Sequence, residues 1–312
     1  MTIRIGLNGH DPVLYFLSTL GIVEPALDRI GVDVEWVPYA PGPRAPWLLG
    51  ETLDFVGCGQ TPMLHAHSDA IDAVYVASSP NRPLQGALVV PQNSDVRGPA
   101  DLKNKRVSFA VQAWPAQLVA GALGQVGLTI ADVTAVVPDG DNDLKALRDS
   151  TIDAAVLLGP RLVQAEEAGL IRQLIPTDSA VCNRHLFTTT REFATSRTRE
   201  LQIILTAMEQ ACDWVLNNFA EAARRRAHEV RYEAAHWGGD EHSWLQILQR
   251  MPWSIAPIDS ALIDQQDHHA QLLHAAGVLA KPVSAREYFL PELPWLVRAA
   301  VADAHAQLTG AR

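Results

Sequence analysis

The stretch LDFVGCGQTP, residues 53–62, predicts a buried strand, a glycine-rich loop and the start of a helix. The same order recurs in IRIGLNGHDP (residues 3–12), VSFAVQAWP (107–115) and AAVLLGP (154–160). Each stretch ends in proline, which we expect at the first helical position, because its missing N–H leaves no hydrogen bond unmade there. The sequence therefore predicts four strand–loop–helix units.

These four loops together indicate a binding site. In a doubly wound α/β fold, loops at the carboxyl ends of strands hold ligands, and free N–H groups at helix starts attract anions. A proline near a helix start is common by itself, so one such loop carries no functional conclusion. Two pairs of loops from two sheets would face each other across a cleft, and we expect an anion site there.

The alternation of strands and helices continues through the first two-thirds of the chain. Further β-branched runs are expected as strands at Val32–Val37, Ala73–Val76, Leu88–Val90, Thr134–Val137 and Leu186–Thr190. From about Arg197 onward the pattern is helical, with helix starts predicted at Asp240 and Asp259. The order is typical of an α/β protein with parallel sheets and a helical C-terminal part.

Charge and cysteine content narrow the function classes. The 312 residues carry 35 acidic and 25 basic side chains, a formal net charge of −10. A nucleic-acid binder needs a basic stripe, and the densest basic cluster is only Arg224–Arg226, so we expect no nucleic-acid partner. Cys58, Cys182 and Cys212 are too few for a disulfide framework or, by themselves, a zinc site.

We expect no leader segment, because Met1-Thr2 leads directly into the strand predicted at residues 3–7. The uncharged run 107–131 is long enough to span a bilayer, but Gln112 and Pro115 interrupt it. We interpret it as strand, loop and helix and expect no membrane insertion. The expected location is cytoplasmic for the chain as written and periplasmic if a leader has been trimmed.

Motifs spread over the chain carry a family resemblance. VYVASSP (residues 74–80), LVVP (88–91), DLKNKRV (101–107) and Pro257-Ile258 follow one another in the order and spacing of solute-binding proteins of the aliphatic-sulfonate, taurine and nitrate type. The chain resembles this group from about Ile3 to Tyr288, within a superfamily that includes NMT1/thiamine-pyrimidine-synthase-like proteins. The resemblance implies a two-lobed α/β periplasmic-binding-protein type II fold that closes on a small anion for an ABC importer. It also implies lobe one at 1–86 plus 187–312 and lobe two at 87–186.

The same resemblance places the candidate ligand-binding residues on the four loops and one later segment. They are Asn8, Gly9, His10, Cys58, Gly59, Gln60, Thr61, Gln112, Ala113, Trp114, Gly159, Arg161 and Trp253. Family members usually have small hydroxyl residues at 112–115, Trp-Asp-Pro-Tyr at 158–161 and tyrosine near Trp253. We therefore expect a ligand other than the usual alkyl sulfonates. Trp114 and Trp253 favour a flat or aromatic one, since an indole offers a large stacking face.

Trp114 has two alternative roles. As the cap residue before Pro115, it would leave the amides near Ala116 and Gln117 free for an anion, because an indole accepts no hydrogen bond. Its ring would then cover the apolar part of the ligand, and His10 would add a charge or hydrogen bond from the opposite wall. In the other role, Trp114 packs into the core of lobe two.

Enzymes on the same scaffold are the second hypothesis. Thiamine-pyrimidine-forming relatives need clustered cysteines and a lysine near the position of Thr61, so we reject that activity. Sulfinate-cleaving relatives have a cysteine in the first loop, where this chain has Asn8-Gly9-His10. A Cys58/His10 pair could replace it, although a lone cysteine is more often a small buried residue.

We therefore favour binding over catalysis. The expected function is the substrate-binding component of an ABC importer, holding a sulfonate-like or aromatic acid, with an ABC permease as partner and with no cofactor or metal. A cytoplasmic desulfinase- or decarboxylase-type enzyme acting on a small aromatic or sulfur-containing acid is the alternative.

Overall fold

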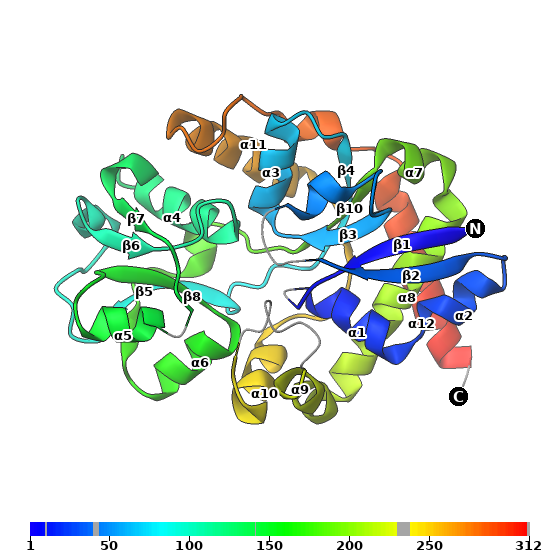
Figure 1. Ribbon diagram of the computed structural model, residues 1–312, viewed down its shortest axis with the longest axis horizontal. Coiled ribbons are helices and arrows are strands. Elements are labelled where there is room, and N and C mark those ends of the chain that lie inside the picture. Colours follow the sequence, from blue (N-terminus) through cyan, green and yellow to red (C-terminus); the bar gives the residue numbers. More distant parts are fainter. Residues whose placement is uncertain (10, 40–43, 141, 230–237, 311–312) are drawn as a thin grey trace.

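The computed structural model describes residues 1–9, 11–39, 44–140, 142–229 and 238–310, which form two lobes (Figure 1). The strands are β1 (Thr2–Leu7), β2 (Asp33–Pro38), β3 (Phe55–Cys58), β4 (Ala73–Ser78), β5 (Gly86–Pro91), β6 (Arg106–Ser108), β7 (Thr134–Val136), β8 (Ala154–Leu158), β9 (Ile171–Gln173), β10 (Leu186–Thr190) and β11 (Ala256–Pro257). The helices are α1 (Pro12–Leu20), α2 (Val23–Asp28), α3 (Gln60–Ser68), α4 (Trp114–Gly124), α5 (Asn142–Arg148), α6 (Gly159–Glu167), α7 (Arg191–Ser196), α8 (Thr198–Asn217), α9 (Phe219–Ala227), α10 (Glu241–Arg250), α11 (Ser260–Ala275) and α12 (Leu293–Gly310).

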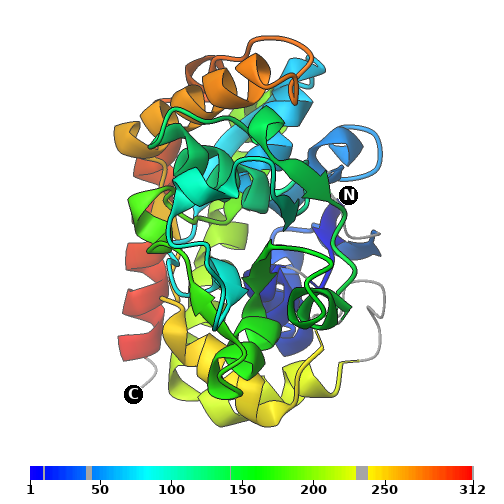
Figure 2. The same cartoon turned by 90° about the vertical axis from the view of Figure 1, so that its left-hand side faces the viewer.

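Each lobe is built on its own sheet. Within the described residues, one sheet has the order β11-β4-β10-β3-β1-β2 and the other the order β7-β6-β8-β5-β9. Figure 2 looks onto the lobe that carries the second sheet. The sequence predicted parallel sheets, but β10 runs antiparallel to β3 and β4, and β5 runs antiparallel to β8 and β9. Both are the first strands after the chain changes lobe. Each of these two strands begins at the edge of the sheet where its neighbouring strands end. Each therefore runs in the direction opposite to those neighbours.

Two crossovers connect the lobes, one between β4 and β5 and one between β9 and β10. Backbone hydrogen bonds join them: the Ser79 amide donates to the His185 carbonyl at 2.8 Å, and the Arg82 amide donates to the Asn183 carbonyl at 2.8 Å. We keep the boundaries 1–86 with 187–312 and 87–186 as a proposal, supported by the sheet to which each strand belongs. The crossovers lie side by side, as a hinge between two rigid bodies requires.

The four prolines of the repeated units lie in the first turns of their helices. Only Pro12 is the first residue of its helix. The other helices begin earlier than expected, at Gln60, Trp114 and Gly159, so Pro62, Pro115 and Pro160 are the second or third helical residue. The first four N–H groups of a helix have no intrahelical partner, so proline fits at any of these positions.

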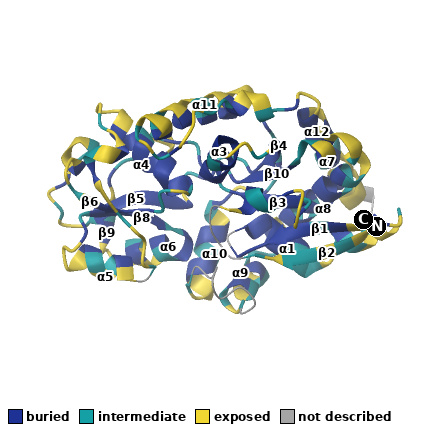
Figure 3. Ribbon diagram, turned by 45° about the horizontal axis from the view of Figure 1, so that its top comes forward, coloured by how far each residue is buried: buried dark blue, intermediate teal, exposed yellow. Residues whose placement is uncertain are grey.

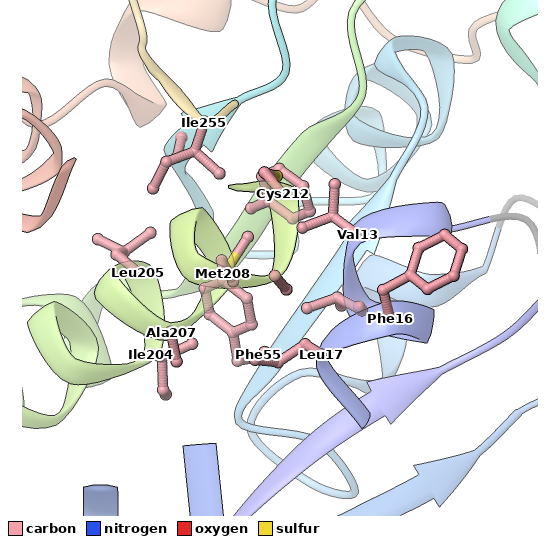
Figure 4. Packing of buried hydrophobic residues seen from close by; sticks show 14 of the residues in the cluster. Val13, Phe16, Leu17, Phe55, Ile204, Leu205, Ala207, Met208, Cys212 and Ile255 are labelled. Atoms are coloured by element: carbon pink, nitrogen blue, oxygen red, sulfur yellow. The ribbon is translucent and has the colours of Figure 1, made fainter. Parts of the chain in front are cut away.

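Buried apolar side chains fill both lobes, and the exposed faces of the helices lie outside (Figure 3). In lobe one, Ile204, Leu205 and Met208 of α8 belong to the same buried cluster as Val13 and Leu17 of α1 (Figure 4). Two of the helix starts predicted in the C-terminal part are confirmed, because Asp240 and Asp259 cap α10 and α11 through their carboxylates.

Candidate ligand-binding cleft

A cleft of about 610 Å³ lies between the lobes and beside both crossovers. Its polar side chains come almost entirely from lobe one and the crossovers: Asn8, Tyr39, Cys58, Arg82, Gln85, Asn183, Arg184 and His185. Lobe two supplies Phe109–Pro115, Ala135–Pro138 and Leu158, of which only Gln112 has a polar side chain apart from the indole N–H of Trp114. The cleft therefore has one polar and one largely apolar wall.

The structure brings part of the predicted site together. Asn8, Cys58, Gly59, Gln112, Ala113 and Trp114 line the cleft, whereas Gly9, Gln60, Thr61, Gly159, Arg161 and Trp253 do not. His10 lies outside the described residues, so the proposed Cys58/His10 pair is not described either. The loops of three units reach the cleft, but the fourth contributes only Leu158.

Trp253 packs in the core of lobe one, which corrects its expected role against the ligand. It is 5% exposed, its indole N–H donates to the Leu248 carbonyl at 2.9 Å, and its ring meets Phe16 edge-on with centroids 5.6 Å apart. The segment after α10 folds back onto that helix, so the indole satisfies a carbonyl of the last helical turn.

Other predicted residues also have structural partners away from the cleft. The Arg161 guanidinium lies beside Gly140, where an added Cβ would be 3.2 Å from Nη2. Gln60 is fully buried, and its Oε1 accepts from the Arg184 amide at 2.9 Å. The Gly9 carbonyl accepts from Arg226 at 2.7 Å. These residues hold the loops in place from behind.

Trp114 is the first residue of α4, not its cap. Ala113 is the cap, and its carbonyl accepts from the Ala116 amide at 2.9 Å. The expectation that this amide stays free for an anion is therefore wrong. The indole is 7% exposed and packs in the lobe-two core, while still lining the cleft. The core-packing role is thus the larger one.

Cys58 ends β3 and is 6% exposed. Burial raises the pKa of its thiol far above the usual range, and the nearby charge of Asp11 adds to the shift. A nucleophilic cysteine must be a thiolate. Cys58 is therefore a poor candidate for the nucleophile that the enzyme alternative needs.

Arg82, on the first crossover, is a buried cation that lines the cleft. It was not among the site residues predicted from the sequence. It is 5% exposed, and none of the described residues forms a hydrogen bond or ion pair with its guanidinium. Burial lowers the pKa of Arg82 to about 10, and Asp11 opposes part of that shift. The side chain therefore remains charged at neutral pH and is desolvated, and no carboxylate of the described residues forms an ion pair with it.

Asp11 is itself occupied by other partners. One carboxylate oxygen accepts from the Leu14 amide at 3.0 Å and caps α1, and the other lies 3.0 Å from Nε2 of His185. Gly57 makes room for this pair, because a Cβ there would be 1.6 Å from Asp11 Oδ2. Arg184, the other cleft arginine, pairs with Asp259 at 3.0 Å.

This arrangement favours the entry of an anion. A buried charge without a partner costs free energy, and an entering carboxylate or sulfonate would offset that cost through charge-assisted hydrogen bonds. Within the described ranges, no group of three or more His, Cys, Asp or Glu side chains is placed to hold a metal ion. Likewise, none of the helices described is both long and apolar enough to cross a bilayer.

Comparison with known proteins gives the same picture of the fold. The profile of the NMT1/THI5-like family matches residues 28–222. A protein of Escherichia coli (strain K12) named for aliphatic sulfonate binding is 23% identical over 256 residues, covering 81% of this chain and 78% of its own length. A protein of Bacillus subtilis (strain 168) with the same kind of name is 26% identical over 223 residues, covering 71% and 67%.

Solved structures extend the likeness to nearly the whole chain. The alkanesulfonate-binding protein SsuA of Xanthomonas axonopodis pv. citri, solved with MOPS bound, superposes with a TM-score of 0.77 at 24% identity, covering 93% of this chain and 98% of that one. SsuA of Escherichia coli gives 0.80 at 21%, covering 93% and 92%. The desulfurization enzyme DSZB gives 0.62 at 14%, covering 97% and 99%. These likenesses confirm the two-lobed periplasmic-binding-protein fold.

Proposed function

This chain belongs to the NMT1/THI5-like family, and from that premise we propose that it binds a small organic anion, sulfonate-like or carboxylate, in the cleft between its lobes. We propose further that it serves as the substrate-binding component of an ABC importer. The relatives named for aliphatic sulfonate binding, and the SsuA structure that holds MOPS, support this class of ligand.

The observation that carries the proposal is the buried guanidinium of Arg82 in the cleft, with which none of the described residues pairs. A protein interior rarely holds a charge without a partner, since the desolvation cost is several kcal/mol. The neighbouring carboxylate of Asp11 is engaged by His185 and by the start of α1. An anionic ligand is the partner that completes this site.

The enzyme alternative has no comparable support. Its candidate nucleophile, Cys58, is held as a thiol by burial. The desulfurization enzyme DSZB shares the fold at 14% identity, a level that says nothing about shared chemistry. We therefore propose binding alone.

Thermal unfolding with a panel of anions tests the proposal. We expect ethanesulfonate, benzenesulfonate or benzoate to raise the Tm of the wild type, because a ligand at roughly a hundred times its Kd stabilises a protein by about 2.7 kcal/mol. Arg82→Gln should abolish the shift. Arg298→Gln, which removes an exposed arginine of α12, is the control with the same change in net charge.

Either of two results would contradict the proposal. If the Tm of the wild type stays constant with every anion, or Arg82→Gln responds as the wild type does, the cleft is not an anion site built on Arg82. Arg82→Lys keeps the charge and serves as the second variant if the glutamine variant fails to fold.

A further inference from the structure

We propose that the cleft takes an amphipathic organic monoanion in one fixed orientation, with its acid group at the crossovers and its apolar body against lobe two. This inference rests on the proposed function and adds the class of ligand and its direction. It also reverses the sequence expectation that the anion lies at the start of α4.

The crossovers supply convergent hydrogen-bond donors. Arg82 and Gln85 both line the cleft. The crossovers that carry them are joined by hydrogen bonds, because Asn183 Nδ2 donates to the Arg82 carbonyl at 3.1 Å and to Gln85 Oε1 at 3.4 Å. Neither the Arg82 guanidinium, whose Nε is buried, nor the amide nitrogen of Gln85 donates a hydrogen bond to any of the described residues. These free groups suit the oxygens of a carboxylate or sulfonate.

One uncompensated charge matches one negative charge on the ligand. Of the two arginines that line the cleft, Arg184 pairs with Asp259 at 3.0 Å, and the described residues give Arg82 no such partner. A second negative charge on the ligand would have to be buried without a cation. A monoanion therefore fits the cleft better than a dianion.

The start of α4 is poorly suited to hold the acid group. The Ala116 amide is taken by the Ala113 carbonyl, and the cap residue Ala113 offers no side-chain donor. Trp114, the first residue of α4, packs into the core of lobe two. The lobe-two wall therefore offers an apolar contact surface, whereas the crossovers offer a positive charge.

The apolar wall is large enough to need a sizeable ligand body. Val111, Trp114, Val136, Val137, Pro138 and Leu158 contribute to it, and Val137 is 84% exposed. A volume of about 610 Å³ lies in the range of sites that enclose drug-sized ligands, well beyond a two-carbon sulfonate. A ring system would bury Val137 and its neighbours, whereas a short alkyl chain would leave them in water.

Two matched variants test the orientation by calorimetric titration with naphthalene-2-sulfonate and naphthalene-2-carboxylate. Gln85→Glu and Gln112→Glu make the same chemical change on opposite walls. The first places a carboxylate beside Arg82, and we expect it to weaken binding at least about a hundredfold. The second places one on the apolar wall, where we expect a clearly smaller loss, because the acid group of the ligand lies at the opposite wall.

Ethanesulfonate tests the class of ligand in the same titration. The naphthalene anions should bind the wild type at least about tenfold more tightly, since ring carbons add buried apolar area. The sulfonate and carboxylate arms show which acid group is preferred. Circular dichroism checks the fold of both variants, and Gln85→Ala replaces Gln85→Glu if that variant fails to fold, with an expected loss of about tenfold from the missing amide donor.

The outcomes of these titrations distinguish a failure of the orientation, of the ligand class and of the proposed function. A larger loss in Gln112→Glu than in Gln85→Glu overturns the orientation, and so do equal losses in the two variants. Ethanesulfonate binding as tightly as the naphthalene anions overturns the amphipathic class while leaving the proposed function intact. If none of the three anions binds the wild type, the proposed function fails, and this inference fails with it.

Discussion

Gly57 shows at the residue scale why the buried pair behind the cleft can exist. Its missing side chain lets Asp11 approach β3 and reach His185, which lies 174 positions later in the chain. Both carboxylate oxygens of Asp11 are thereby engaged, one by the Leu14 amide and one by His185, and neither forms an ion pair with Arg82. The placement of the Asp11 carboxylate therefore depends on the missing side chain of Gly57, which itself lines the cleft.

Gly57→Ala should therefore lower the free energy of unfolding by about 3 kcal/mol or more. The new Cβ would collide with the Asp11 carboxylate and force it away from His185 inside the protein. Urea denaturation measures the change. Gly124→Ala is the control, since a Cβ there meets only Leu272 at 3.8 Å. Equal stability of the two variants would contradict the described packing.

The three cysteines should differ in reactivity. Burial raises the pKa of Cys58 and Cys212, whereas Cys182 is partly exposed. We expect iodoacetamide at neutral pH to label native Cys182 first and to leave the other two unlabelled until the protein unfolds, because only a thiolate reacts. Peptide mass spectrometry reads the sites, with Cys182→Ser as the control. Fast labelling of Cys58 would reopen the enzyme alternative.

At the element scale, α3, α4 and α11 meet through buried polar side chains. Gln266 of α11 accepts from Gln117 of α4 at 3.0 Å and donates to the Gln60 carbonyl of α3 at 3.0 Å. Each of these side chains is fully buried. The network connects α4 of lobe two to α3 and α11 of lobe one, and each of the latter two helices also carries a buried histidine.

Those histidines make stability depend on pH. Burial lowers the pKa of His67 in α3 and of His269 in α11 to about 4. The unfolded chain takes up protons below about pH 6.5, where the folded protein does not. Stability is therefore lost as the pH falls from about 6.5 to 4, by up to about 3 kcal/mol per histidine.

His269→Gln should remove its share of this acid sensitivity, whereas the same change at the exposed neighbour His268 should not. Denaturation midpoints measured across that pH range test the difference. Parallel pH curves for the wild type and His269→Gln would show that His269 does not carry the effect.

Helices and strands with a clear hydrophobic periodicity could be predicted from the sequence, whereas segments without such a periodicity could not. The β-branched run Leu186–Thr190 coincides with β10, and the caps Asp240 and Asp259 locate two helices. Arg82 lies in an aperiodic loop, and its burial arises only when two crossovers distant in sequence meet. The indole of Trp253 would suit a ligand-binding cleft. Its segment folds back onto α10, however, and this tertiary contact places the side chain in the core of lobe one.

At the scale of the whole molecule, contacts outside the cleft also hold the lobes together. Helix α6 of lobe two packs against α10, which belongs to the core of lobe one (Figure 1). Arg250 of α10 pairs with Glu166 of α6 at 2.7 Å, and His242 pairs with Glu167 at 2.9 Å. Hinge opening would have to break these pairs.

Arg250→Gln should consequently weaken ligand binding without touching the ligand. A lower population of the closed form raises the apparent Kd in proportion, and one partly exposed ion pair corresponds to about a two- to fivefold effect. Calorimetry with benzenesulfonate measures it, and small-angle scattering should show a larger radius of gyration without ligand. Arg286→Gln breaks a pair with Asp264 within lobe one and should leave both quantities unchanged.

The crystal structure of the complex with 4-bromobenzenesulfonate tests the central claim most directly. The sulfonate and the bromine mark opposite ends of one small anion, and anomalous scattering locates the bromine. We predict sulfonate oxygens within hydrogen-bond distance of the Arg82 guanidinium and the bromine against Val136 and Val137 of lobe two. A sulfonate at the start of α4, or an anion bound elsewhere while Arg82 stays unpaired, would contradict the account.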